Sequence, residues 1–134
     1  MYILFGTDTP FPASISAQVF DGVRGFVVEE SDSQIRTGES ISSLGDFNDD
    51  GFDDFVIGAP LADPEGTSSG EAYIVFGFDD TAVGAFSADD LDGTNGFRFV
   101  GEDAYDRTGF AVSAAGDLNN DGLADVAIGA RTAL

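Results

Sequence analysis

The sequence predicts an all-β fold made of four-stranded antiparallel β-propeller blades, and three observations support this class. Residues 2–63 align with residues 73–134 at a constant offset of 71, without a gap, and about two in five aligned positions are identical. Each unit contains short runs rich in Val, Ile and Phe between turn-forming residues, a pattern that is typical of strands. Four such runs in a repeat of about 70 residues match the size of one propeller blade.

The strands are expected at matching positions in the two units. In the first unit they occupy residues 2–6, 26–28, 38–44 and 55–59. In the second unit they occupy residues 73–77, 97–100, 109–115 and 126–130. We expect no helix of useful length and no domain linker, so residues 1–134 form a single repeat region with units 2–72 and 73–134.

The composition is strongly acidic, with 25 Asp and Glu against five Arg and no Lys, for a formal net charge of −20. Nucleic-acid binding depends on Lys and Arg that neutralise phosphates, so this class of function is excluded, and anionic membrane surfaces are disfavoured. Self-repulsion of this size destabilises a compact chain, so bound cations are expected to assist folding. A soluble acidic surface is the simpler explanation of the charge, and it is compatible with cation-assisted folding.

Several residue types and segment types are missing from the sequence. There is no Cys, so neither disulfides nor thiolate chemistry is available, and there is no His. No apolar run approaches the roughly 20 residues that span a membrane, so no membrane insertion is expected. Residues 1–6 lack a basic segment and form only a short apolar run, so they are not expected to be a signal peptide.

One acidic stretch occurs in both units with the spacing D-x-N-x-D-G-x-x-D. Side-chain oxygens at positions 1, 3, 5 and 9 converge only if the loop wraps around a centre, and Gly at position 6 permits the sharp turn. A hard cation that takes six to eight oxygens fits that centre, so we predict about two Ca²⁺ per chain. The predicted side-chain ligands are Asp46, Asn48, Asp50 and Asp54, and then Asp117, Asn119, Asp121 and Asp125.

A plain turn, a magnesium site and an EF-hand are the alternatives to a calcium loop between two strands. Asp, Asn and Gly are ordinary turn formers, so a plain hairpin turn would use some of them. Mg²⁺ is less suited than Ca²⁺, because it demands a near-ideal octahedron and keeps its waters. An EF-hand needs Glu at position 12 and a following helix, but Ile57 and Ile128 stand there inside apolar strand-like runs.

With these motifs, the chain resembles the FG-GAP repeats of integrin α-subunit propellers, and more closely their bacterial relatives. The resemblance covers essentially the whole chain and rests on the Tyr-Ile-x-Phe-Gly runs and on G-D-x-N-x-D-G-x-x-D-x-x-I-G-A-P at residues 45–60. It implies that each loop joins the two inner strands of a blade and binds calcium. It also implies a seventh-position backbone carbonyl ligand from Phe52 and from Leu123.

The sequence departs from the family pattern at three places. The Phe of the Phe-Gly position is replaced by Thr37 and by Thr108. Gly-Ala-Pro becomes Gly-Ala-Arg in the second unit, at Arg131, and Glu39 stands where the second unit has Phe110. These changes leave the calcium ligands untouched and put the packing between blades in question.

The family's strand order places one complete blade at about residues 38–100. A second blade is then split, with inner strands at 109–130 and outer strands at 2–30. Two blades cannot form a ring of four to eight, so three arrangements are open. Copies could assemble head to tail by strand complementation, as a trimer of six blades or a tetramer of eight; the chain could be a piece of a longer propeller; or a dimer could exchange strands reciprocally into a sandwich.

The function expected from the family is a non-enzymatic, calcium-stabilised scaffold for extracellular or cell-surface adhesion, of bacterial type. An enzyme would need a nucleophile or a base, yet the chain offers no His, Cys or Lys and no G-x-S-x-G elbow. The alternative is a fragment of a larger extracellular propeller with lectin-like binding or hydrolase activity. Paired carboxylates could serve a hydrolase, although the obvious acidic clusters are assigned to metal. A protein or glycan ligand is therefore possible.

Three smaller expectations concern single residues. The repeated Arg36 and Arg107 are each expected to pair with a nearby acid, such as Asp32 or Asp103, and so to position a loop rather than to bind a ligand. Tyr105, in a turn-rich stretch, is the best single candidate for a surface contact. The acidic loop of the first unit (loop one) carries Asp49 and Asp53, where that of the second unit (loop two) has Asn120 and Ala124. Because of these two extra acids, loop one is predicted to bind calcium more tightly.

Overall fold

The computed structural model describes residues 1–19, 24–29, 35–79 and 85–132, and in these ranges it is an all-β structure without an α-helix. The all-β prediction is confirmed. The strands are β1 (Tyr2–Leu4), β2 (Gly25–Glu29), β3 (Ser40–Gly45), β4 (Asp54–Ala59), β5 (Glu71–Val75), β6 (Ala85–Ser87), β7 (Gly96–Val100), β8 (Thr108–Gly116) and β9 (Asp125–Ala130). Two short 3-10 helices, η1 (Ala17–Val19) and η2 (Ala88–Asp90), complete the described elements.

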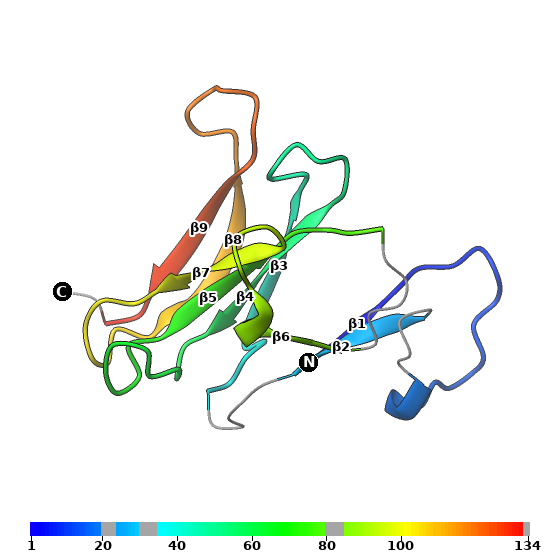
Figure 1. The fold of residues 1–134 in the computed structure, drawn as a ribbon, viewed down its shortest axis with the longest axis horizontal. Coiled ribbons are helices and arrows are strands. Elements are labelled where there is room, and N and C mark those ends of the chain that lie inside the picture. Colours follow the sequence, from blue (N-terminus) through cyan, green and yellow to red (C-terminus); the bar gives the residue numbers. More distant parts are fainter. Residues whose placement is uncertain (20–23, 30–34, 80–84, 133–134) are drawn as a thin grey trace.

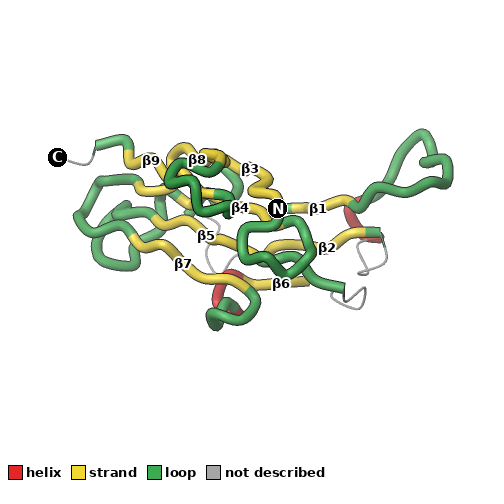
Figure 2. The backbone as a smooth tube through the Cα atoms, turned by 90° about the horizontal axis from the view of Figure 1, so that it is seen from above, coloured by secondary structure: helices red, strands yellow, loops and turns green. Residues whose placement is uncertain are grey.

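The strands form three sheets, as Figure 1 shows. The central sheet has four antiparallel strands in the order β3-β4-β5-β7, which is the arrangement of one propeller blade. A three-stranded sheet has the order β1-β2-β6, and β8 and β9 form a two-stranded hairpin. In Figure 2, the β1-β2-β6 sheet and the β8-β9 hairpin lie toward different ends of the molecule, with the central sheet between them.

The repeat is preserved in the strand registers. Tyr2 faces Val27 in the β1–β2 hairpin, and the residues 71 positions later, Tyr73 and Arg98, face each other in β5–β7. The β3–β4 and β8–β9 hairpins match in the same way, including a register irregularity just before each acidic loop. In the strand order predicted for a blade, β3-β4-β5-β7 corresponds to one complete blade, β1–β2 to an outer hairpin and β8–β9 to an inner hairpin.

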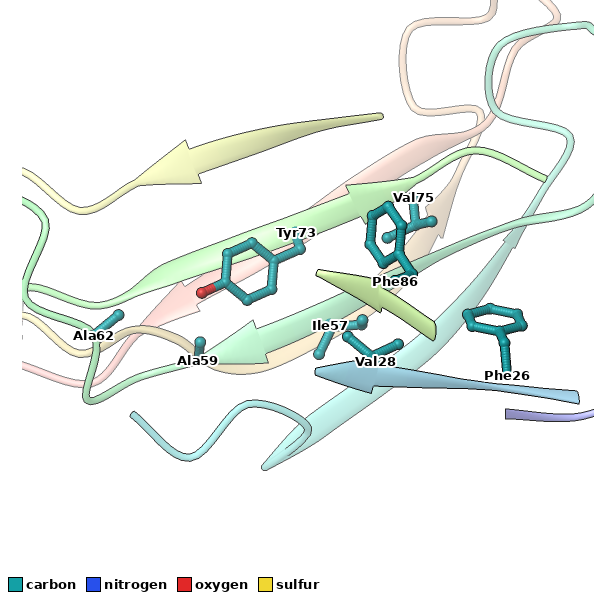
Figure 3. Packing of buried hydrophobic residues seen from close by; sticks show 8 residues of the cluster. All are labelled: Phe26, Val28, Ile57, Ala59, Ala62, Tyr73, Val75 and Phe86. Carbon is teal, nitrogen blue, oxygen red and sulfur yellow. The ribbon is translucent and has the colours of Figure 1, made fainter. Parts of the chain in front are cut away.

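Two hydrophobic clusters lie on opposite faces of the central sheet. Ile57 and Tyr73 belong to the cluster that β2 and β6 cover, and Figure 3 shows this packing. Val56 and Ile74, which are the adjacent residues on β4 and β5, belong to the cluster that β8 and β9 contact. Successive side chains of a strand point to opposite faces, so this alternation buries both faces of the blade. Each fully buried aliphatic or aromatic side chain stabilises the fold by roughly 1.5–3 kcal/mol.

The structure adds one strand that the sequence pattern does not predict. Strand β6 has three residues and pairs in parallel with β2, with Phe86 beside Val28. Its pairing is made by tertiary contact with a distant segment, which a local pattern of three residues cannot reveal. Within the described residues, β1 pairs with β2, β2 also pairs with β6, and β9 pairs with β8, so the two parts of the predicted split blade are not joined inside one copy.

No helix in the described residues is long and apolar enough to cross a membrane.

Candidate metal centres

The first acidic loop connects β3 to β4 and turns its side chains toward its own backbone. The Oδ1 and Oδ2 atoms of Asp46 accept hydrogen bonds from the N–H groups of Asp50 and Gly51, both at 2.9 Å. Asn48 Oδ1 accepts from the same Asp50 N–H at 3.3 Å. Because one N–H group is shared, the oxygens at positions 1 and 3 lie close to each other.

Position 5 joins the same group of side chains. Asp50 Oδ2 accepts a hydrogen bond from Asn48 Nδ2 at 2.7 Å, and Asp50 Oδ1 accepts from the N–H of Phe52 at 2.9 Å. The tight path depends on left-handed backbone at Asp49, with φ of 59°, and at Gly51, with φ of 92°. Glycine takes this conformation without a steric penalty, which explains its place at position 6.

Asp54, at position 9, forms its hydrogen bonds with backbone N–H groups rather than with the other three side chains. Its Oδ2 accepts hydrogen bonds from the N–H groups of Phe47 and Asn48, at 2.7 and 3.3 Å. Its Oδ1 accepts from the N–H of Gly77, at 2.7 Å. The Asp54 side chain is buried, with 1% exposure, and three N–H donors compensate a carboxylate that has lost its water. Asp54 thereby fastens the loop to the segment that follows β5.

The second acidic loop, between β8 and β9, has the same conformation. Asp117 accepts from the N–H groups of Asp121 and Gly122, at 3.0 and 2.9 Å, and Asn119 Nδ2 donates to Asp121 Oδ2 at 2.9 Å. Asp125 Oδ2 accepts from the N–H of Leu118 at 2.6 Å. The φ angles at positions 4 and 6 agree with those of loop one within 1°. The motif therefore specifies this loop geometry twice.

The donor set fits a hard cation, since every predicted ligand is an oxygen and positions 1, 3 and 5 converge in both loops. The structure does not gather the carboxylates into a ready-made cluster. In the described residues no three His, Cys, Asp or Glu side chains come together as a metal-binding group. One ligand position per loop is an Asn, and Asp54 is turned to backbone N–H groups. The ligand assignments, including the Phe52 and Leu123 carbonyls, stay a prediction.

Gly77 is a functional position that the sequence pattern did not single out. A Cβ atom built on Gly77 would lie 2.5 Å from Phe52 Cβ and 2.6 Å from the backbone oxygen of Asp53. Only glycine allows the chain after β5 to approach loop one so closely. The signal was present, because Gly77 ends a Tyr-Ile-x-Phe-Gly run, but nothing local indicates which segment that glycine meets.

Arg36 pairs with a nearby acid, as predicted, whereas Arg107 does not pair with Asp103. Arg36 forms an ion pair with Glu39, at 3.5 Å between Nη1 and Oε2, and Asp32 lies outside the described residues. Arg107 forms no ion pair with Asp103; its backbone N–H donates to Ser68. In the described part of the chain the other ion pair joins Arg98 and Asp89, at 3.9 Å. Arg36 and Arg107 share a φ of 55°, so what repeats at these positions is a left-handed turn.

A cavity of about 480 Å³ lies at the opposite end of the blade from loop one. Glu71 is buried there, and its Oε1 accepts a hydrogen bond of 2.6 Å from the Tyr73 hydroxyl. Its Oε2 has no hydrogen-bond partner in the described residues. Burial, and then the neighbouring Glu71, raise the pKa of the Tyr73 phenol above its ordinary range. Arg98 and Asp63 line the same cavity. Tyr105 does not line this cavity, and 60% of its surface is exposed to solvent.

Comparison with known proteins agrees with the repeat and its loops. The FG-GAP repeat family model matches residues 37–75 and 108–133. The first match contains β3, β4 and β5 with loop one, and the second contains β8 and β9 with loop two. The chain is an FG-GAP repeat protein. The two loops described above are thus the centres of its two FG-GAP matches, and the predicted family is confirmed.

The chain is also similar to parts of much longer integrin alpha proteins. Integrin alpha-2 of Mus musculus is 35% identical over 105 residues, which is 75% of this chain and 8% of that protein. Integrin alpha-4 of Xenopus laevis is 37% identical over 98 residues, covering 71% and 8%. Integrin alpha-PS2 of Drosophila melanogaster is 36% identical over 99 residues, covering 73% and 7%. This chain spans less than a tenth of the length of these relatives.

Proposed function

We propose that this FG-GAP chain is a calcium-stabilised, non-enzymatic propeller module of an extracellular or cell-surface scaffold of the adhesion type. The observation that carries the proposal is the identical geometry of the two loops, each with convergent oxygens at positions 1, 3 and 5. The similarity to several integrin alpha chains supports the adhesion-type role and the cell-surface location. The bacterial type of the repeat stays a prediction from the sequence.

Calcium acts structurally in this proposal. Each loop carries three carboxylates among its predicted ligands, and their mutual repulsion opposes the closed hairpin. The cation supplies positive charge at the centre of the loop, and the side chains and the position-7 carbonyl hold it. An ion that binds the folded chain better than the unfolded chain stabilises it by mass action. The large negative charge of the chain adds to this dependence on cations.

We also propose that copies of the chain assemble head to tail into a trimer or tetramer. The unjoined halves of the split blade support this, because each copy presents one inner and one outer hairpin. A longer protein in which further repeats supply the missing hairpins is the alternative, and in that case the ligand of the whole protein lies with those repeats.

One observation favours a second function, the binding of a small polar ligand such as a glycan. The cavity beside Glu71 holds a buried carboxylate oxygen without a hydrogen-bond partner in the described residues. A ligand hydroxyl could donate to that oxygen. A glycan array with wild type and Glu71→Gln as the matched pair tests this function, and a screen of glycosidase and phosphoesterase substrates on the assembled form tests the enzymatic alternative.

Native mass spectrometry of a calcium-loaded sample, repeated after chelation, tests the main proposal. About two calcium ions per chain in a trimer or tetramer are expected. Chelation is expected to lower the thermal unfolding midpoint. A defined oligomer that chelation leaves unchanged in mass and stability would reduce both loops to ordinary turns and contradict the proposal.

A further inference from the structure

The central blade shows how an inner and an outer hairpin join in this protein. Strand β4 of the inner hairpin pairs antiparallel with β5 of the outer hairpin. The two remaining hairpins have the same internal registers as these two, displaced by 71 residues. In the described sheets, β9 and β1 each lie at an edge. They are the repeat counterparts of β4 and β5.

We propose that β9 of one copy pairs antiparallel with β1 of a second copy of this chain and so completes the split blade. This inference rests on the proposed self-assembly and specifies its seam. In the central blade Phe55 faces Val75. The offset of 71 residues then places Val126 of one copy opposite Leu4 of the second copy.

Burial differs between the repeats as this seam requires. Leu4 is 49% exposed, whereas its counterpart Val75 is 1% exposed. Ala127 is exposed, whereas its counterpart Val56 is fully buried. Pairing β9 with the second copy's β1 covers the positions that the central blade already buries. The edge also gains backbone hydrogen-bond partners, which an isolated sheet edge lacks.

The second calcium loop is incomplete without the second copy. In loop one, the N–H of Gly77, two residues after β5, donates to Asp54 Oδ1. The counterpart of Gly77 is Gly6, two residues after β1, and in the described residues Asp125 has no such donor. The seam places the second copy's Gly6 N–H against Asp125 Oδ1. Calcium binding at loop two and association of the copies are therefore coupled, and each strengthens the other.

A further segment of the second copy fits against β7, the edge strand of the central blade. Strand β2 is covered by β6 in parallel, with Val28 beside Phe86. The same offset places Ile15 of the second copy beside Phe99 of β7, and Phe99 is 49% exposed. Residue 15 belongs to the segment after β1, which projects away from the three sheets in Figure 1. The projecting segment can thus reach a neighbouring copy.

Gly6→Val tests the seam without disturbing a single copy. A Cβ atom on Gly6 meets nothing within 4 Å in one copy, and its backbone does not require glycine. Across the seam the added side chain meets loop two of the copy that presents β9, as a Cβ on Gly77 would meet Phe52 at 2.5 Å. We expect the midpoint concentration of assembly in calcium to rise about tenfold or more. Unchanged assembly of Gly6→Val overturns the seam.

Engineered disulfides test the register, and the absence of native Cys makes them clean probes. Leu4→Cys combined with Val126→Cys is expected to link copies covalently under mild oxidation, because directly opposed strand residues meet disulfide geometry. Leu4→Cys combined with Ala127→Cys is the matched control, since a shift by one residue turns one thiol to the other face. Equal linking by both pairs, or linking by the control alone, overturns the register.

Thermal unfolding with and without calcium, on the same samples, separates this inference from the proposed function. A chain that calcium stabilises but that sediments as a monomer at every concentration overturns the seam and keeps the calcium module. A chain that assembles, yet forms no disulfide link between Leu4→Cys and Val126→Cys, overturns the register alone. A chain that calcium does not stabilise overturns the proposed function itself.

Discussion

The two acidic loops have one geometry but different surroundings. Loop one belongs to the complete blade, where Asp54 is buried and receives three backbone hydrogen bonds, one of them from Gly77. Loop two belongs to the inner hairpin, where Asp125 is only partly buried and receives a single hydrogen bond in the described residues. The motif is thus sufficient for the shape of the loop. The burial of the carboxylate at position 9 depends on the segment after the outer strand, as Gly77 shows for Asp54.

The largest expected difference between the loops concerns position 9. Asp54→Ala leaves three N–H groups in and near a buried site without their acceptor, so we expect a loss of about 3 kcal/mol or more of unfolding free energy. Asp125→Ala in a dilute, monomeric sample is expected to cost about 1 kcal/mol, since one partly exposed hydrogen bond is lost. Urea denaturation in excess calcium measures both values, and equal losses would contradict the difference between the two surroundings.

The glycines after β5 and β1 give the next largest contrast. Gly77→Ala forces its Cβ against loop one, so we expect a loss of about 1–3 kcal/mol from overpacking. Gly6→Ala adds a methyl group in open space, so its effect on a dilute sample is expected to stay within about 0.5 kcal/mol. Thermal unfolding of the two variants checks this pair. Similar destabilisation by both would mean that the approach of Gly77 to the loop is relaxed in solution.

A smaller contrast is expected in calcium affinity. Asp49 and Asp53 are exposed at loop one and are not among the predicted ligands, so they would act on a bound ion through space. Asp121→Ala, which keeps site one, is expected to bind calcium up to about tenfold more tightly than Asp50→Ala, which keeps site two. Isothermal titration at low and high salt measures the ratio, and salt is expected to reduce it because exposed charges are screened. A ratio near one at low salt would show that the extra acids have no effect.

The last contrast concerns Tyr73 in the complete blade, and its effect on the free energy of unfolding changes only at alkaline pH. Burial and Glu71 raise the pKa of its phenol above the ordinary value of 10.0. The unfolded chain therefore ionises this group first as the pH rises, and the folded chain keeps it protonated. Its contribution to stability is complete below pH 10 and is lost progressively at higher pH. Denaturation between pH 8 and about pH 11 is expected to show this decline, and Tyr73→Phe is expected to flatten it.

Much of the fold could be predicted because the repeat is strict. The short apolar runs are local properties of the sequence, and the fixed offset of 71 residues showed that they recur, so together they placed eight of the nine described strands. Strand β6 escaped because three residues of tertiary pairing leave no local signal. The pairing of Arg107 with Asp103 was wrong because spacing along a turn does not say which way a long side chain points.

The candidate site was predictable only in part, for the same reason. Asp, Asn and Gly at fixed spacing encode a loop through hydrogen bonds between neighbours, so the convergence of Asp46, Asn48 and Asp50 follows from the motif. The hydrogen bond from the N–H of Gly77 to Asp54 comes instead from a residue 23 positions away. Spacing within the loop carries no information about that approach.

The repeat, eight of the nine described strands, the acidic loops and the family all follow from the amino-acid sequence, because each leaves a pattern that can be read within one short stretch or by comparing two stretches. Tertiary packing is needed to establish which faces are buried, which carboxylate is enclosed and which strands are left at an edge. Burial depends on contacts between segments that are far apart in the sequence. Two stretches with nearly the same sequence, such as β4 and β9, therefore have different environments, and the environment of β9 points to a neighbouring copy.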